Sequence, residues 1–240
     1  MLPILLSVAT FFSTLLGGIA GLKNRDRLHR LLGLTAGVVI GVVAFDLLPE
    51  IFKSIGHGVT DREAMVALVC GFLVFHIVEK SILIHHSQEH EYEVHHHPQV
   101  GIASALALSG HSFLDGLGIG LGFQAGNAVG ISVAIAVIAH DFADGLNTVT
   151  LMMINRNNRR RAFAMLLVDA FAPVVGAIVG TMIHISDGGL TLYLGFFAGF
   201  LLYIGASEIL PEAHSKHSSY VTIALTVFGA MFMFFVTRYA

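Results

Sequence analysis

Residues 100–123 read VGIASALALSGHSFLDGLGIGLGF, a long apolar stretch with polar side chains inside it. The stretch is long enough to cross a bilayer, which takes roughly 20 residues of helix. His111 and Asp115 lie near its middle, where an Asp that faces lipid costs about 2.5–3.5 kcal/mol. It therefore predicts a transmembrane helix whose polar side chains face the wet or liganded interior of a bundle.

Apolar runs of similar length follow one another along the chain. Of its 240 residues, 55% are hydrophobic and 12% are charged, whereas an average soluble domain carries about twice that charged share. We predict an all-α membrane fold, with one transmembrane domain over residues 1–240 and eight transmembrane helices. The predicted helices cover residues 2–22, 31–54, 64–84, 100–123, 127–153, 162–184, 189–210 and 219–237. A cleaved signal peptide is the alternative for the first run, although that run lacks a basic start.

Basic side chains are distributed unevenly over the predicted loops. If eight helices alternate in direction, all but three of the 13 lysines and arginines fall on one side of the membrane. The exceptions are Lys53, Arg62 and Arg238. The positive-inside rule then places both termini outside and the basic loops in the cytosol. The sequence has no basic stripe of the kind that binds nucleic acid.

Three pairs of similar motifs recur along the chain. They are Gly17–Gly21 with Gly176–Gly180, DLLPE at 46–50 with EILPE at 208–212, and HSFLDGL at 111–117 with HDFADGL at 140–146. The first two pairs lie five helices apart, an odd number, so the paired helices run in opposite directions. This order predicts an inverted repeat, with helices 1–3 and 6–8 as related halves around helices 4 and 5. Chance similarity in a chain rich in Gly and Leu is the alternative.

The third motif pair predicts a metal site. Residues at i and i+4 share a helix face, so His111 and Asp115 point the same way, as do His140 and Asp144. On two antiparallel helices these side chains meet near the bilayer midplane. Two imidazoles and two carboxylates suit a tetrahedral Zn²⁺ ion, and also Fe²⁺, Mn²⁺ or Co²⁺. A set of buried polar groups that bond the helices together is the alternative.

Three neighbouring residues are further candidates for this site. Asp141, one position after His140, is a fifth ligand, part of a second metal site or a proton acceptor. Ser112 holds the matching position on the other helix, with weaker donor power. Asn147, three residues after Asp144, either binds the ion or orients one of its ligands.

Acidic and histidine side chains on both sides of the site indicate a path for cations. Asp46 and Glu50 at the outer end of helix 2 are the predicted entrance. The predicted exit on the cytosolic side consists of His76, Glu79, Glu208, Glu212 and His214. Simple solvation is the alternative for Glu50 and Glu212. A buried pair is the alternative for His76 and Glu79. Asp169 is likewise either an exit ligand or a member of a buried pair.

Residues 85–98 are rich in histidine and glutamate and predict a disordered cytosolic loop. Such a composition suits loose and flexible binding of metal, which would be regulatory. The histidines concerned are His85, His86, His90, His95, His96 and His97. A solvated loop without a role is the alternative.

With these motifs the chain resembles the ZIP (Zrt-/Irt-like) family of metal transporters. The resemblance rests on the paired H-x-x-x-D-G motifs, the eight helices, the outer termini and the histidine-rich loop. It implies uptake of Zn²⁺ into the cytosol as substrate, with Fe²⁺, Mn²⁺, Cd²⁺ and Co²⁺ as further ions. It also implies a 3+2+3 arrangement of helices, often in a homodimer. A plasma membrane or a bacterial inner membrane is the expected location.

Some members of that family hold two metal ions, and the chain departs from their pattern. In those members Asn follows the helix 4 His and Glu precedes the helix 6 Pro, whereas Ser112 and Ala172 stand here. The comparison implies one strong site. The family usually has Glu where this chain has Asp115 and Asp144, and the shorter side chain is expected to alter the metal preference.

An intramembrane zinc-dependent hydrolase is the alternative function. Histidines, aspartates and Ser112 around a zinc ion can activate water. The inverted repeat and the acidic groups on both faces have no role in hydrolysis, however, and four ligands would tend to fill the position that water needs. We therefore expect a transporter rather than an enzyme.

Overall fold

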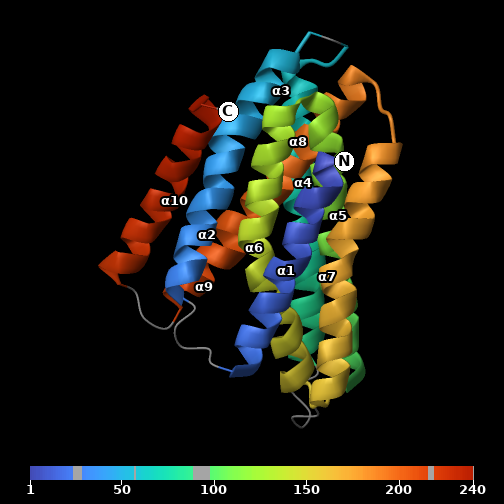
Figure 1. Cartoon of the computed structure of the whole chain (residues 1–240), viewed down its shortest axis with the longest axis vertical. Coiled ribbons are helices and arrows are strands. Elements are labelled where there is room, and N and C mark those ends of the chain that lie inside the picture. Colours follow the sequence, from blue (N-terminus) through green and yellow to red (C-terminus); the bar gives the residue numbers. More distant parts are fainter. Residues whose placement is uncertain (24–28, 57, 89–97, 216–218, 240) are drawn as a thin grey trace.

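The computed structural model describes residues 1–23, 29–56, 58–88, 98–215 and 219–239 (Figure 1). Within these ranges it leaves out the side chains of residues 23, 29, 30, 79, 82–88 and 239. All regular elements of the described chain are helices. They are α1 (Leu2–Lys23), α2 (His29–Val42), η1 (Val43–Leu47), α3 (Leu48–Ser54), α4 (Asp61–Gln88), α5 (Pro98–Ala125), α6 (Asn127–Ile154), α7 (Arg159–Met182), α8 (Asp187–Tyr203), η3 (Ile204–Ile209), α9 (Leu210–His214) and α10 (Tyr220–Tyr239).

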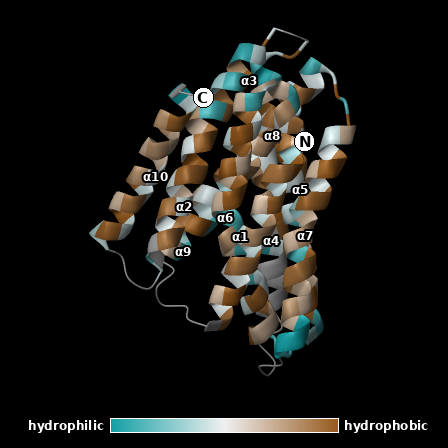
Figure 2. Ribbon diagram, in the orientation of Figure 1, coloured by the Kyte–Doolittle hydropathy of each residue, from teal (hydrophilic) through white to brown (hydrophobic). Residues whose placement is uncertain are grey.

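Seven stretches of the described chain are long and apolar enough to cross a membrane. They are Leu2–Leu22, Leu31–Ser54, Pro98–Ala125, Asn127–Ile154, Arg159–Met182, Asp187–His214 and Tyr220–Arg238. Figure 2 shows hydrophobic colours along the shafts of the helices and hydrophilic colours mainly at their ends. The predicted all-α membrane fold is confirmed. The 28-residue α4 is not among the seven stretches, although it packs along α8 within the same bundle.

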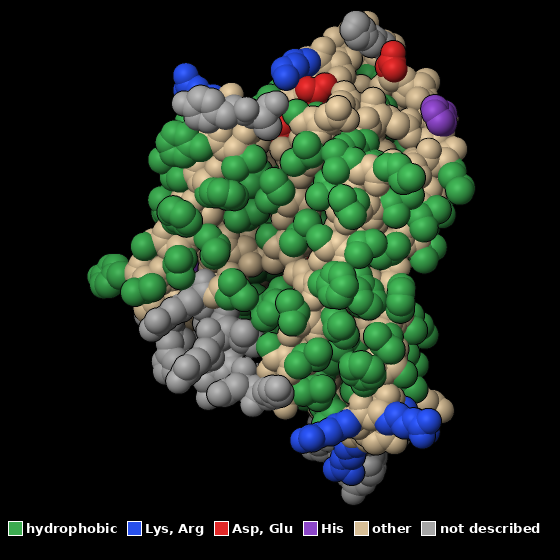
Figure 3. All heavy atoms as spheres, viewed as in Figure 1, with side chains coloured by type: hydrophobic (Ala, Val, Ile, Leu, Met, Phe, Trp, Pro, Cys, Tyr) green, Lys and Arg blue, Asp and Glu red, His purple; other side chains and the backbone are tan. Residues whose placement is uncertain are grey.

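The two ends of the bundle differ in what they carry. Both chain ends lie at the upper end in Figure 1, which we call the termini end. The α6–α7 turn lies at the lower end, where Figure 3 shows lysine and arginine side chains gathered. That turn contains Arg156, and α7 begins with Arg159, Arg160 and Arg161; we call this the arginine end. α5 runs from the arginine end to the termini end, and α6 returns.

Glycines bring the helices of this bundle into backbone contact. α5 packs on α7, and α1 packs on α6. A β-carbon at Gly116 would collide with the carbonyl oxygen of Pro173, and one at Gly17 with that of Phe142. Small residues allow this approach within a membrane, where lipid tails give apolar surfaces no reason to associate. The two motif-bearing helices, α5 and α6, are therefore fixed by close neighbours on either side.

The helices formed by residues 29–54 and 187–214 each contain one π-helical turn. η1 and η3 come directly before Leu48-Pro49 and Leu210-Pro211. A proline lacks the N–H that an α-helix needs and its ring crowds the preceding turn. The chain widens there instead, so that the Leu48 N–H bonds to the Val43 carbonyl and the Leu210 N–H to the Gly205 carbonyl. These turns hold Asp46 and Glu208, and the apolar pattern does not predict them.

Candidate metal centre

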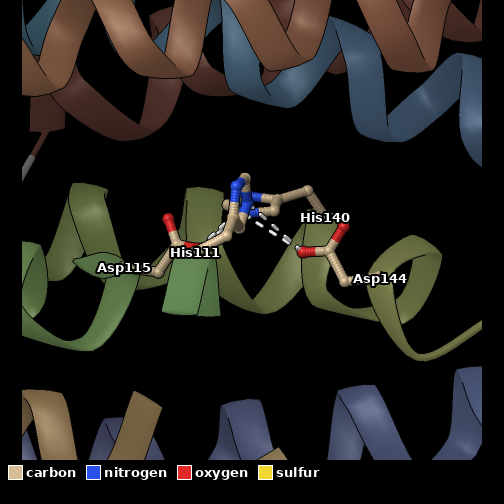
Figure 4. A group of neighbouring side chains, drawn as sticks. All are labelled: His111, Asp115, His140 and Asp144. Atoms are coloured by element: carbon tan, nitrogen blue, oxygen red, sulfur yellow. Dashed lines mark ion pairs between the residues drawn. The ribbon is translucent and has the colours of Figure 1, made fainter. Parts of the chain in front are cut away.

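Four side chains from α5 and α6 converge in the middle of the bundle (Figure 4). α5 supplies His111 and Asp115, and α6 supplies His140 and Asp144. One ligand atom of each lies within 4.8 Å of the other three. The i, i+4 spacing on two antiparallel helices thus brings together the four residues that the sequence predicts. We call this set the metal centre.

The two carboxylates of the metal centre bridge the two imidazoles. Asp115 Oδ2 lies 3.3 Å from His111 Nε2 and 3.4 Å from His140 Nε2. Asp144 Oδ2 lies 3.7 Å from each of the same nitrogens. These four atoms are buried and make no hydrogen bond within the described chain. Because buried polar atoms in native proteins nearly always have a partner, their convergence fits a site built for a cation.

The two histidines are held in different ways. His140 is fully buried, and its Nδ1–H donates to the Ala136 carbonyl at 2.9 Å. Since a carbonyl only accepts, this bond fixes the tautomer and leaves Nε2 for a metal. The His111 ring lies edge-on to Phe75 and Phe200, with centroids 5.8 and 4.7 Å away. Neighbouring rings thus orient His111, and the backbone of its own helix orients His140.

A cavity of about 930 Å³ connects the metal centre to the arginine end. His111, Asp144 and Asn147 line its inner part, while Glu212 and Ser215 line it at the end of α9. On the other side the α6 positions before His140 are packed in the apolar core. Those residues are Val133, Ala134, Ala136 and Val137. The metal centre is therefore open toward the arginine end and covered toward the termini end.

Ser112 and one oxygen of Asp141 are next to the metal centre but bond elsewhere, while the other oxygen of Asp141, Oδ1, is buried without a hydrogen-bond partner in the described chain. Asp141 Oδ2 accepts a hydrogen bond from Thr14 Oγ1 at 3.2 Å, and Oδ1 lies 3.8 Å from His140 Nε2. The Ser112 hydroxyl donates to Asp169 Oδ1 at 2.8 Å, away from the centre. Of the three further candidates, Asn147 alone lines the cavity.

The predicted entrance lies at the termini end. Asp46 is in η1, with a buried Oδ2 that has no hydrogen-bond partner in the described chain. Glu50 is in α3, where Lys53 Nζ donates to its Oε2 at 3.3 Å. The apolar core described above separates both carboxylates from the metal centre.

The predicted exit residues divide into two groups. Glu208 and Glu212 line the cavity. His76 lies against the Tyr203 ring, with centroids 5.7 Å apart, and His214 Nδ1–H donates to the Leu210 carbonyl. The cavity lining includes neither histidine.

Several predicted residues lie where the structure describes no side chain. Glu79, His85 and His86 belong to α4, which runs four residues into the segment that we expect to be a loop. Their side chains are outside the description. His90, His95, His96 and His97 lie outside the described residues altogether.

Three buried polar residues beside the metal centre are not singled out as its partners by the sequence. Thr14 comes from α1, Thr148 from α6 and Asp169 from α7. A hydroxyl in an apolar span is common and carries little signal. The hints are the carboxylate of Asp169 within an apolar span and the position of Thr148 four residues after Asp144, on the same helix face.

The fold and the site together define a helical membrane protein with a buried nitrogen and oxygen centre for a metal ion. Comparison with known proteins goes one step further. The family model described as ZIP zinc transporter matches residues 84–237. The chain belongs to this family, which confirms the resemblance found in its motifs, and the family is one of transporters rather than enzymes.

Curated relatives cover nearly the whole chain. A protein of Campylobacter jejuni named zinc transporter ZupT is 28% identical, over 97% of this chain and 94% of its own length. The ZupT of Chlorobium limicola is 26% identical over 95% of this chain and 92% of its own length. The ZupT of Streptococcus mutans is 26% identical over 97% of this chain and 94% of its own length. The likeness thus extends from the first helix to the last.

Proposed function

We propose that this protein carries divalent metal ions, Zn²⁺ foremost, across the cell membrane into the cytosol through the metal centre. The observation that carries the proposal is the convergence of two Nε2 and two Oδ2 atoms in a bundle, at the inner end of a cavity. The names of the relatives, which are zinc transporters, support zinc as the substrate.

The ligand chemistry suits an ion that is bound and released. Two neutral imidazoles and two carboxylates cancel the charge of one divalent ion, so a bound ion adds little net charge to the bilayer core. Structural zinc sites bind with about 10–16 kcal/mol and keep their ion. A centre without thiolates is weaker, and its nitrogen and oxygen atoms also accept Fe²⁺, Mn²⁺, Co²⁺ and Cd²⁺.

Direction follows from the charges at the ends of the bundle. The positive-inside rule places the arginine end in the cytosol and both termini outside. The cavity then opens toward the cytosol, and the structure represents the state that releases metal. Asp46 and Glu50 attract cations outside, while Glu208 and Glu212 receive them on the way out. Asn147, beside Asp144 in the cavity, is the first polar group that a leaving ion meets.

An inverted repeat of eight transmembrane helices, with α4 as the third, belongs to the same proposal. The glycine contacts support it because they occur in matched pairs. Gly17 of α1 lies against the Phe142 carbonyl of α6, and Gly176 of α7 lies in the same way against the Phe113 carbonyl of α5. Gly37 of α2 lies against the Thr226 carbonyl of α10, and Gly199 of α8 lies in the same way against the Leu68 carbonyl of α4. The matched π turns of η1 and η3 support it too. A 3+2+3 order and assembly as a homodimer complete the proposal.

The test is metal uptake by liposomes that contain the purified protein and a trapped indicator. We expect saturable zinc uptake that is lost in His111→Ala and in His140→Ala. His184→Ala is the matched control, because His184 is exposed between α7 and α8 and should leave uptake unchanged. Competition with Mn²⁺, Fe²⁺, Co²⁺ and Cd²⁺ then ranks the ions. Folded protein without uptake above that of empty liposomes would refute transport, and uptake that survives both substitutions would refute the route.

A further inference from the structure

Asp169 makes one link between the two helices that carry the metal centre. It lies on α7 and is fully buried. Its Oδ1 accepts a hydrogen bond from Ser112 Oγ of α5 at 2.8 Å, and its Oδ2 accepts one from Thr148 Oγ1 of α6 at 2.7 Å. A single carboxylate therefore joins both helices, one oxygen to each.

The two hydroxyls that bind Asp169 are beside metal-centre residues. Ser112 follows His111 directly, and Thr148 comes one helical turn after Asp144. A shift of α5 along α6 would move the two histidines and the two carboxylates relative to each other. Because Asp169 holds Ser112 and Thr148 at fixed distances from one point on α7, it opposes such a shift.

Both hydroxyls have little choice of partner other than Asp169. Ser112 and Thr148 are fully buried, so water does not compete for their protons. Ser112 Oγ lies 3.2 Å from the Leu108 carbonyl, which is longer than its bond to Asp169. A hydroxyl has one proton to donate, and a carboxylate is the stronger acceptor. Asp169 is thus the better partner, and it gives these polar residues one defined arrangement.

We infer that Asp169 is a positioning residue that holds α5 and α6 in the register the metal centre needs, by accepting one hydroxyl from each helix. The inference rests on the proposed metal site. In it Asp169 does not bind the ion itself. Outer-sphere partners of metal ligands typically change affinity by about 10–100-fold when they are lost. Asp169 acts one bond further away, through Ser112 and Thr148, so we expect the lower end of that range.

The test is zinc affinity of the purified full-length protein in detergent, measured by competition with a chelating dye. The six histidines of the 85–98 segment are replaced by Asn throughout, so that the membrane site alone is titrated. Asp169→Asn keeps the shape but replaces one acceptor by a donor, and we expect Kd to rise about tenfold. Asp169→Leu removes both acceptors and should raise Kd further. The visible absorption of bound Co²⁺ should change in both variants, because it reports ligand geometry.

A double-mutant cycle separates positioning from general packing. Ser112→Ala and Thr148→Val should each weaken binding in the parent protein and have no further effect in Asp169→Leu, because their shared partner is gone. Ser109→Ala is the matched control. Ser109 is buried on the same helix, but its hydroxyl bonds to the Ala105 carbonyl of α5 and to no other helix of the described chain. That variant should keep the parent Kd and Co²⁺ spectrum.

Two results would overturn the inference. One is an unchanged Kd and Co²⁺ spectrum in Asp169→Leu and in the milder Thr148→Val. The other is two bound ions in the parent protein and one in Asp169→Asn, which would make Asp169 a ligand. Because binding is measured without a membrane, these results are independent of whether the protein transports metal in liposomes.

Discussion

His111 and His140 occupy equivalent motif positions but differ in their access to the cavity. The His140 side chain is fully buried, whereas 11% of the His111 side chain is exposed. The carboxylates differ likewise. Asp115 is fully buried, and Asp144 lines the cavity. Each helix thus contributes one enclosed ligand and one ligand that an ion in the cavity meets first.

The enclosed carboxylate should matter more for affinity. Asp115→Asn removes a charge whose Oδ2 lies 3.3 and 3.4 Å from the two histidine nitrogens, where water cannot replace it. Asp144 is farther away, at 3.7 Å from both, and is reached by the cavity. We expect Asp115→Asn to raise the Kd for zinc about tenfold more than Asp144→Asn does. Titration with a chelating dye measures both.

Asp187→Asn provides the control for that comparison. Asp187 is exposed in the first turn of α8 and should not affect the Kd. An equal loss in the two metal-centre variants, or a larger one in Asp144→Asn, would contradict the assignment of Asp115 as the enclosed ligand.

At the scale of helices, the α5–α7 contact is the structural support of the metal centre. Gly116 comes directly after Asp115 and lies against the backbone of Pro173, which cannot rotate away as a side chain can. Gly110 is on the same helix, directly before His111, and a β-carbon there would meet no atom within 4 Å. A β-carbon would therefore collide at Gly116, beside Asp115, but would fit freely at Gly110, beside His111.

Gly116→Ala should destabilise the protein, whereas Gly110→Ala should not. Overpacking of a close contact costs about 1–3 kcal/mol, and separation of α5 from α7 would also displace Asp115. Thermal unfolding in detergent and zinc uptake by liposomes measure the two effects. A Gly116→Ala variant with the stability and uptake of the parent would show that α5 and α7 can separate here without harm to the metal centre.

The helix positions follow from the chain itself, because each apolar run ends at polar residues. The run expected at 127–153 forms α6 at Asn127–Ile154, and the i, i+4 spacing brings the four ligands together. The π turns are not predictable in this way, because a proline after an apolar run is equally consistent with an ordinary helix kink. The Ser112–Asp169 bond joins residues 57 positions apart, and no local spacing indicates such a pair.

For the whole molecule, the cavity predicts which side of the membrane has access to the metal centre. Asn147 lines it, whereas Val133, on the other side of His140, is buried in the apolar core. Cys70 is the only cysteine, so Cys70→Ala gives a background without thiols. In that background Asn147→Cys should react with a membrane-impermeant maleimide added at the arginine end, the proposed cytosolic side, and Val133→Cys should not.

Zinc at saturating concentration should slow the labelling of Asn147→Cys, because the bound ion lies beside it. Labelling in vesicles of known orientation measures both access and protection. Reaction of Asn147→Cys only from the side of the termini would reverse the proposed direction, and fast reaction of Val133→Cys would contradict the closed outer side.

The size of the cavity bears on how an ion loses and regains its hydration shell. At roughly 30 Å³ for each water in the liquid, about 930 Å³ is room for some thirty molecules. On the proposed route, an ion that leaves His111 and Asp144 would enter a space large enough to hold its hydration shell before it reaches the cytosol. At the termini end the packed core offers no such volume, so an ion on the proposed route would lose its water there. On the proposed route into the cytosol we therefore expect dehydration on the way in, rather than release, to limit the flux.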